Sequence, residues 1–253
     1  MVPPVHDEPK PFLDHLEDLR WMIIKSVITL ALAMGLSCVF ARELLYLLQW
    51  PLRRMAEVQG EQLETYLRTL QVMDAFSMVL QTGFVAGLVI SLPFIFYFIA
   101  EFILPALHPR ERRLLLPVFF FGGGLFLSGA FFCFILVLPN ALGWMVDLNH
   151  WIGVRPEWTL QSYLGFTLQM LVAFGLSFEL PLVMAVLAKL DIVTSTFFKT
   201  YRRHAVVVLL IFAACVTPTS DPYNLMLLFG PLYLLYEIGI WITLLIERRR
   251  ESV

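Results

Sequence analysis

Two acidic side chains stand where they could recognise a cationic ligand. Asp18 lies in the acidic stretch 14–20, directly before the first long apolar run, and Glu111 lies among basic residues between two later apolar runs. Exposed carboxylates can accept two parallel hydrogen bonds from a guanidinium group, a geometry that selects arginine over lysine. Asp14 and Glu17 have a simpler explanation, since acids near a helix N-terminus interact favourably with its dipole, by about 0.3–1 kcal/mol each.

Two further carboxylates, Glu179 and Glu237, fall inside apolar runs. A carboxylate at membrane depth is costly and normally faces protein or a water-filled cavity. Gly175 and Pro181 flank Glu179, a combination that makes room and allows a helix bend. We expect the two carboxylates at similar depth, bordering one polar concavity. The alternative for Glu179 is a protonated side chain bonded to a neighbouring helix.

Other residue types give little sign of catalysis or metal binding. Cysteines are odd in number and lie in apolar segments, which predicts buried packing residues rather than disulfides. Histidines have no partner at helical spacing, which argues against a metal site. The motifs H-E-x-x-H, G-x-S-G and G-x-G-D are absent. We therefore expect no enzyme, no cofactor and no metal.

The elements that must hold these carboxylates are membrane helices. Hydrophobic residues make up 59% of the 253 residues and the mean hydropathy is +0.77, which excludes an ordinary water-soluble domain. A helix needs about 20 apolar residues to cross the hydrocarbon of a bilayer. The sequence predicts an all-α membrane protein forming a single domain, with six spans at about residues 21–41, 75–100, 114–138, 163–188, 205–216 and 223–246.

The distribution of basic residues predicts the orientation of these spans. Lysine and arginine are retained near span ends on the cytoplasmic side. With the N-terminus inside, thirteen basic residues fall on that side and five on the other, so both chain ends are predicted to be cytoplasmic. The five external residues are Arg42, Arg53, Arg54, Arg68 and Arg155. The opening residues lack the basic region and cleavage site of a signal peptide, so we expect the first span to be kept.

Three connections carry further expectations. The fifth run is short and stops before Thr217-Pro218, which leaves open a short transmembrane hairpin, the option we favour, or a re-entrant one. Residues 51–74 alternate apolar and charged side chains, which predicts one or two amphipathic helices divided at Gly60. Residues 139–162 form a predicted external loop whose aromatic residues anchor the water–lipid boundary. These residues are Trp144, Trp151 and Trp158, with Tyr163 just beyond the loop.

Five ordered motifs resemble those of one family: TatC, the multispanning subunit of the twin-arginine protein translocase. The amino-terminal pattern H-L-x-E-L-R is similar to residues 15–20, and the loop pattern ending in E-R-R is similar to residues 110–113 after Pro105-Ala106-Leu107. Residues 174–181 resemble F-G-x-x-F-E-x-P, residues 217–221 resemble T-P-P-D, and residues 231–239 resemble a pattern ending in E-I-G. The resemblance covers nearly the whole chain.

The resemblance implies a fold, a function and partners. The fold would be a cup-shaped bundle of six helices with cytoplasmic termini and short fifth and sixth helices. The function would be to bind twin-arginine signal peptides of folded precursor proteins and to assemble with the single-span subunits TatA and TatB for export driven by the proton-motive force. The location would be the bacterial inner membrane, in a multimeric complex within the lipid bilayer, with no nucleic-acid partner.

Site residues follow from the resemblance by position. The family's recognition carboxylates correspond to Asp18 and Glu111, and the neighbouring basic residues of the same motifs are Arg20, Arg112 and Arg113. Glu179 and Glu237 would contact partner or signal-peptide helices, and Asp221 would lie in an external loop. The chain departs from the family pattern in two places: Asp18 replaces a glutamate, and one extra residue precedes Asp221.

A proton-coupled secondary transporter that relays protons through Glu179 and Glu237 is the competing interpretation. Such transporters are built from internal repeats with interrupted helices in corresponding positions. The sequence contains no convincing repeat, so we favour the translocase subunit.

Overall fold

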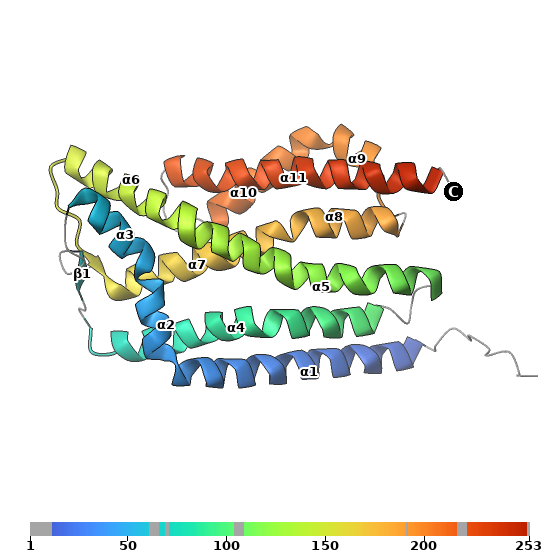
Figure 1. The fold of residues 1–253 in the computed structure, drawn as a ribbon, viewed down its shortest axis with the longest axis horizontal. Coiled ribbons are helices and arrows are strands. Elements are labelled where there is room, and N and C mark those ends of the chain that lie inside the picture. Colours follow the sequence, from blue (N-terminus) through green and yellow to red (C-terminus); the bar gives the residue numbers. More distant parts are fainter. Residues whose placement is uncertain are drawn as a thin grey trace, which may run out of the picture.

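A computed structural model describes residues 12–60, 66–68, 71–103, 109–190, 192–216 and 222–251, and these residues are almost entirely helical (Figure 1). The helices are α1 (Phe12–Val39), α2 (Ala41–Leu48), α3 (Trp50–Gln59), α4 (Asp74–Ile103), α5 (Pro109–Phe132), α6 (Leu138–Trp151), α7 (Leu160–Phe178), α8 (Leu180–Lys189), α9 (Ser195–Thr200), α10 (Arg202–Val216) and α11 (Pro222–Glu251). Two short strands, β1 (Leu67–Arg68) and β2 (Trp158–Thr159), pair in parallel.

Within the described residues, five helical stretches are long and apolar enough to cross a membrane. They are His15–Val39, Asp74–Ile99, Phe121–Trp151, Leu160–Lys189 and Pro222–Arg248. The predicted all-α membrane class is thus confirmed. Helix α10 has 15 residues and is about 22 Å long, less than a bilayer core needs. The count of six crossings therefore stays a prediction.

Helix α11 differs from what the family resemblance implied. A short sixth helix was expected, but α11 has 30 residues, so that expectation is wrong. Pro231 lies inside the helix without ending it. Neighbouring helices can satisfy the backbone group that such a proline frees, which lets the apolar run continue into its charged end at Arg248.

The long helices form a row in which each packs on the next (Figure 1). Helix α1 packs on α4, α4 on α5, α5 on α7, α8 on α11, and α11 on α10. Only 11% of the most apolar part of α1 is buried inside the protein, against 44% of the most apolar part of the span Leu160–Lys189. The centre of the fold is therefore α7–α8, and α1 is a lipid-exposed edge.

Helices α1 and α4 approach closely at two glycines. A Cβ at Gly83 would lie 2.4 Å from Cys38 Sγ, and one at Gly87 would lie 2.6 Å from the backbone nitrogen of Met34. Lipid offers no hydrophobic driving force between helices, so close backbone contact over small residues supplies packing energy instead. This contact fixes α1 against α4.

Helices α5 and α6 are continuous through a π-helical stretch, Cys133–Val137. The Leu138 N–H bonds to the carbonyl of Cys133, five residues earlier. Pro139 follows directly, and a proline ring clashes with the carbonyl four residues before it in a regular α-helix. The wider turn accommodates Pro139, so the helix continues to Trp151 through the first half of the segment that we predicted as an external loop.

The paired strands β1 and β2 lie at the end of the bundle near α2 and α3 (Figure 1). Helix α3 ends at Gly60, which has φ 72°, at the position where the sequence predicted a division, and residues 61–65 beyond it lie outside the described residues. Tyr66 stacks on Trp158 at 5.8 Å between ring centroids. Tyr163 was predicted as a boundary anchor but is 3% exposed and donates a hydrogen bond to the Leu48 carbonyl at 2.6 Å. It therefore ties α7 to α2.

Candidate functional site

The candidate recognition residues of α1 lie where this helix meets the end of α4. The His15 ring stacks on Phe102 with centroids 4.5 Å apart and an interplanar angle of 16°. The Lys25 ammonium pairs with Glu101 at 3.1 Å and lies 5.8 Å from the centre of the Phe98 ring. These contacts join the first turns of α1 to the last turns of α4.

Asp18 lies between these two contacts along α1. Residues 15, 18 and 25 are spaced by three and seven positions, so they share one face of the helix. Asp18 is half-buried, whereas Glu17 and Arg20 are exposed. The separate roles given to Asp18 and Glu17 from the sequence stay predictions.

The second predicted group, Glu111 with Arg112 and Arg113, lies in the first turns of α5, which begins at Pro109. The sequence had placed it in a loop. Proline is favoured at the first position of a helix because its missing N–H would have no partner there, and an acid soon after complements the helix dipole. The beginnings of α1 and α5 lie at the same end of the bundle as the end of α4 (Figure 1). Asp221 lies outside the described residues.

Glu179 occupies the bend between α7 and α8. Pro181 follows two residues later, and the chain passes through Glu179 with its N–H bonded to Leu176, only three residues earlier. The sequence-based expectation of a bend is therefore confirmed. The room that Gly175 provides is filled, because a Cβ there would lie 2.4 Å from the ring of Phe126.

The Glu179 side chain is 8% exposed and faces α5. Its Oε2 lies 3.3 Å from the position that a Cβ on Gly122 would take, with Leu182 and Phe96 close to the same point. No side chain of the described residues donates a hydrogen bond to either carboxylate oxygen. Glu179 is thus a buried acid that lies beside a glycine and among leucine and phenylalanine side chains.

Glu237 has different surroundings. Arg202 donates to its Oε2 at 2.7 Å, and the Tyr233 hydroxyl donates to Oε1 at 3.1 Å. Because Glu237 faces α10 while Glu179 faces α5, the structure gives no support to a concavity lined by both carboxylates. It correspondingly removes the geometric basis for a proton relay between them.

Sequence reasoning missed a set of polar contacts that holds α9 and α10 against α11, which we call the C-terminal latch. Glu247 accepts hydrogen bonds from the backbone N–H and the hydroxyl of Ser195, at the beginning of α9. Tyr236 donates to the Phe198 carbonyl at 2.8 Å, and Arg202 pairs with Glu237. The Thr194-Ser195 pair is typical of a helix N-cap and was the one available signal. Glu101, the partner of Lys25, was likewise overlooked.

Comparisons with known proteins agree with this arrangement. The family model of the Sec-independent protein translocase protein (TatC) matches residues 14–231. The TatC protein of Deinococcus radiodurans is 37% identical over 91% of this chain and 84% of its own, and that of Aquifex aeolicus is 31% identical over 96% and 98%. The TatC protein of Akkermansia muciniphila is 38% identical over 78% of this chain, which spans 57% of that protein's length.

A solved structure of the twin arginine translocase receptor TatC superimposes with a TM-score of 0.80 at 30% identity, covering 92% of this chain and 99% of the other. The comparisons favour a translocase subunit over a secondary transporter. With its apolar helices, the chain is a multi-pass membrane protein. It belongs to the TatC family of Sec-independent protein translocase proteins.

Proposed function

We propose that this chain is the receptor subunit of a twin-arginine translocase in a bacterial inner membrane. It binds the paired arginines of signal peptides on folded precursor proteins, and it assembles with the single-span subunits TatA and TatB for export driven by the proton-motive force. Its role is binding and not catalysis. Family membership and the likeness to a translocase receptor support this proposal.

The observation that carries the recognition role is the junction of α1 and α4. His15 on Phe102 and Lys25 on Glu101 hold the first turns of α1, and with them the backbone of Asp18. A carboxylate on a fixed backbone loses less conformational entropy when it binds a guanidinium. We assign Asp18 and Glu111 as the two carboxylates that read the arginine pair, with Arg20, Arg112 and Arg113 beside them.

The same end of the bundle is proposed to face the cytoplasm. The beginning of α1 and the end of α11 lie there together (Figure 1), which supports an even number of crossings and hence α10 as a short crossing, the fifth in chain order. The excess of basic residues on this side supports the orientation. Asp221 would then belong to the connection on the opposite, external face.

Glu179 is proposed as the residue through which helices of TatA, TatB or the signal peptide are engaged. Its carboxylate is buried without a side-chain donor in the described residues, and an incoming polar group would recover part of the cost of that burial. Glu237 would have to leave Arg202 before it could contact a partner. We therefore give Glu179 the larger share of this role.

Peptide binding tests the recognition role. With purified full-length protein, Glu111→Gln and Asp18→Asn are each expected to weaken binding of a twin-arginine peptide about tenfold, the loss of one charge-assisted interaction. A twin-lysine peptide should bind the unchanged protein poorly, since it lacks the guanidinium fork. Glu17→Gln is the matched control, because this neighbouring exposed acid has no assigned contact with the peptide.

Two outcomes would overturn the assignment. Equal affinity for twin-arginine and twin-lysine peptides would remove the bidentate carboxylate–guanidinium contact. Equal weakening by Glu17→Gln and Glu111→Gln would show that overall negative charge, rather than these positions, attracts the peptide.

A further inference from the structure

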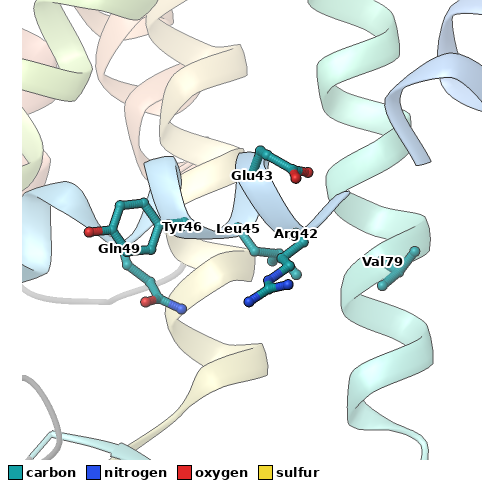
Figure 2. Close-up of a pocket in the computed structure, with 6 residues that line it drawn as sticks. All are labelled: Arg42, Glu43, Leu45, Tyr46, Gln49 and Val79. Atoms are coloured by element: carbon teal, nitrogen blue, oxygen red, sulfur yellow. The ribbon is translucent and has the colours of Figure 1, made fainter. Parts of the chain in front are cut away.

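A recess of about 590 Å³ lies between α2 and α4 (Figure 2). Its lining residues are Arg42, Glu43, Leu45, Tyr46, Gln49 and Val79. Helix α2 and the beginning of α4 lie at the end of the bundle opposite the beginning of α1 (Figure 1). The candidate membrane span of α1 ends at Val39, and that of α4 begins at Asp74. The recess is therefore at the level where a lipid headgroup meets hydrocarbon, and the proposed recognition of signal peptides makes no use of it.

The surroundings of the recess are apolar and exposed. Leu47 is 54% exposed on α2, and Phe76 is 63% exposed on α4. Phe40, just before α2, and Leu80, on α4, are also exposed. Such side chains at the end of a membrane span face acyl chains, so the recess is open to lipid.

Three arginines lie on α2 and α3, and two of them are engaged. The Arg53 guanidinium lies 3.7 Å from the centre of the Tyr46 ring and donates to Gln49 at 3.2 Å. Arg54 lies over Trp50 at 5.4 Å. Among the described residues, Arg42 pairs with no carboxylate, and its guanidinium projects on the same side of α2 as the amide of Gln49 (Figure 2).

We propose that this recess binds a glycerophospholipid whose phosphodiester rests on Arg42. A guanidinium matches two phosphate oxygens at once, and basic recesses between membrane helices are suited to lipid headgroups. Leu45 and Val79 would contact the glycerol and the first methylenes. The Glu43 carboxylate is directed to the opposite side of α2 from the Arg42 guanidinium (Figure 2), so it does not select the headgroup.

The same features disfavour a free phosphate ion. Much of the recess is bounded by apolar side chains, which contribute to affinity only when the ligand carries hydrocarbon. The ligand therefore needs a phosphate and acyl chains in one molecule.

The test uses the full chain in detergent after removal of lipid, titrated with dioctanoyl phosphatidylethanolamine and followed by native mass spectrometry. Arg42→Gln is expected to weaken binding about tenfold. Glu43→Gln should leave binding unchanged, because its carboxylate is directed away from the Arg42 guanidinium (Figure 2). Arg155→Gln is the matched control: it removes the same charge from an exposed position outside the recess and should bind as the unchanged protein does. Each variant's melting temperature reports that it is folded.

Each alternative occupant has its own outcome. If dioctanoylglycerol competes as well as the phospholipid, the recess binds hydrocarbon only. If inorganic phosphate competes equally, the site is a simple anion site. If Arg42→Gln and Arg155→Gln weaken binding alike, the interaction is unspecific charge attraction. Any of these results overturns the proposal.

Discussion

The centre of the bundle and its C-terminal edge are held together by different interactions. At the centre, around Glu179, rings fill the space left by glycines: Phe126 lies against Gly175, and Phe178 lies 2.6 Å from where a Cβ on Gly129 would be. At the edge, the C-terminal latch joins α9 and α10 to α11 through Glu247, Tyr236 and the pair of Arg202 with Glu237. The centre is packed, and the edge is hydrogen-bonded.

The lengths of the helices explain this difference. Helices α5 and α7 are long, so many small contacts along them add up to a stable interface without any polar bond. Helix α10 has 15 residues and α9 has six, too few for packing alone to hold them. Hydrogen bonds and an ion pair from charged and hydroxyl side chains of α11 provide the additional stabilisation that holds α9 and α10 in place. The two embedded carboxylates therefore have different roles: Glu237 stabilises the edge, whereas Glu179 has no such partner in the described residues.

The largest effect on stability is expected from a glycine substitution at the centre. Gly175→Ala places a Cβ 2.4–2.7 Å from three ring atoms of Phe126, which is fully buried and cannot move aside. Overpacking of this kind costs about 1–3 kcal/mol. Gly239→Ala is the matched variant on α11, the helix that carries the edge. The nearest atom there is the Sδ of Met184 on α8, whose flexible side chain can adapt for less than about 1 kcal/mol.

Thermal unfolding in detergent compares the two glycine variants. The melting temperature is expected to be highest for the wild-type protein, lower for Gly239→Ala and clearly lowest for Gly175→Ala. Equal melting temperatures for the two variants would mean that the centre tolerates rearrangement as readily as the edge, and the contrast in packing would be lost.

An intermediate effect is expected from the ion pair of the latch. Arg202→Gln and Glu237→Gln should each lower the free energy of unfolding by about 1–2 kcal/mol, because each leaves one charge without its partner; the pair is partly exposed, so the effect is smaller than for a buried pair. The double variant should cost less than the sum of the two, since the residues interact directly. Arg203→Gln, the adjacent exposed residue, should change stability by less than about 0.5 kcal/mol. Strict additivity in this cycle would show that the pair contributes nothing.

The sequence predicts the centre of the bundle, around Glu179, better than it predicts the C-terminal edge. Long apolar runs indicate membrane helices by length alone, and Gly175 with Pro181 indicated the bend at Glu179. Periodicity and composition report what one helix does along its own length. They do not report which helix faces which, so the different neighbours of Glu179 and Glu237 could not be deduced from their similar positions in apolar runs.

The latch and the α1–α4 junction escaped prediction for the same physical reason. Lys25 with Glu101 and Ser195 with Glu247 are separated by 76 and 52 residues, and neither pair has a local spacing that would mark it. The continuation of α5 into α6 was hidden by Pro139, which normally ends a helix and is accommodated here by a π-helical turn. Whether a helix continues past a proline in this way depends on tertiary contacts, which cannot be read from the sequence alone.

The smallest effect on stability is expected from Glu179, and comparing it with Glu237 gives the sharpest contrast between the two regions. Glu179→Gln keeps the shape and polarity of the side chain and breaks no hydrogen bond or ion pair with a described side chain, so its free energy of unfolding should stay within about 0.5 kcal/mol of the wild-type value. Glu237→Gln should destabilise. Photocrosslinking to single-span partner subunits should show the reverse, with loss in Glu179→Gln and little change in Glu237→Gln. If Glu179→Gln instead unfolds as readily as Glu237→Gln while crosslinking is retained, Glu179 stabilises the fold and the proposed partner contact lies elsewhere.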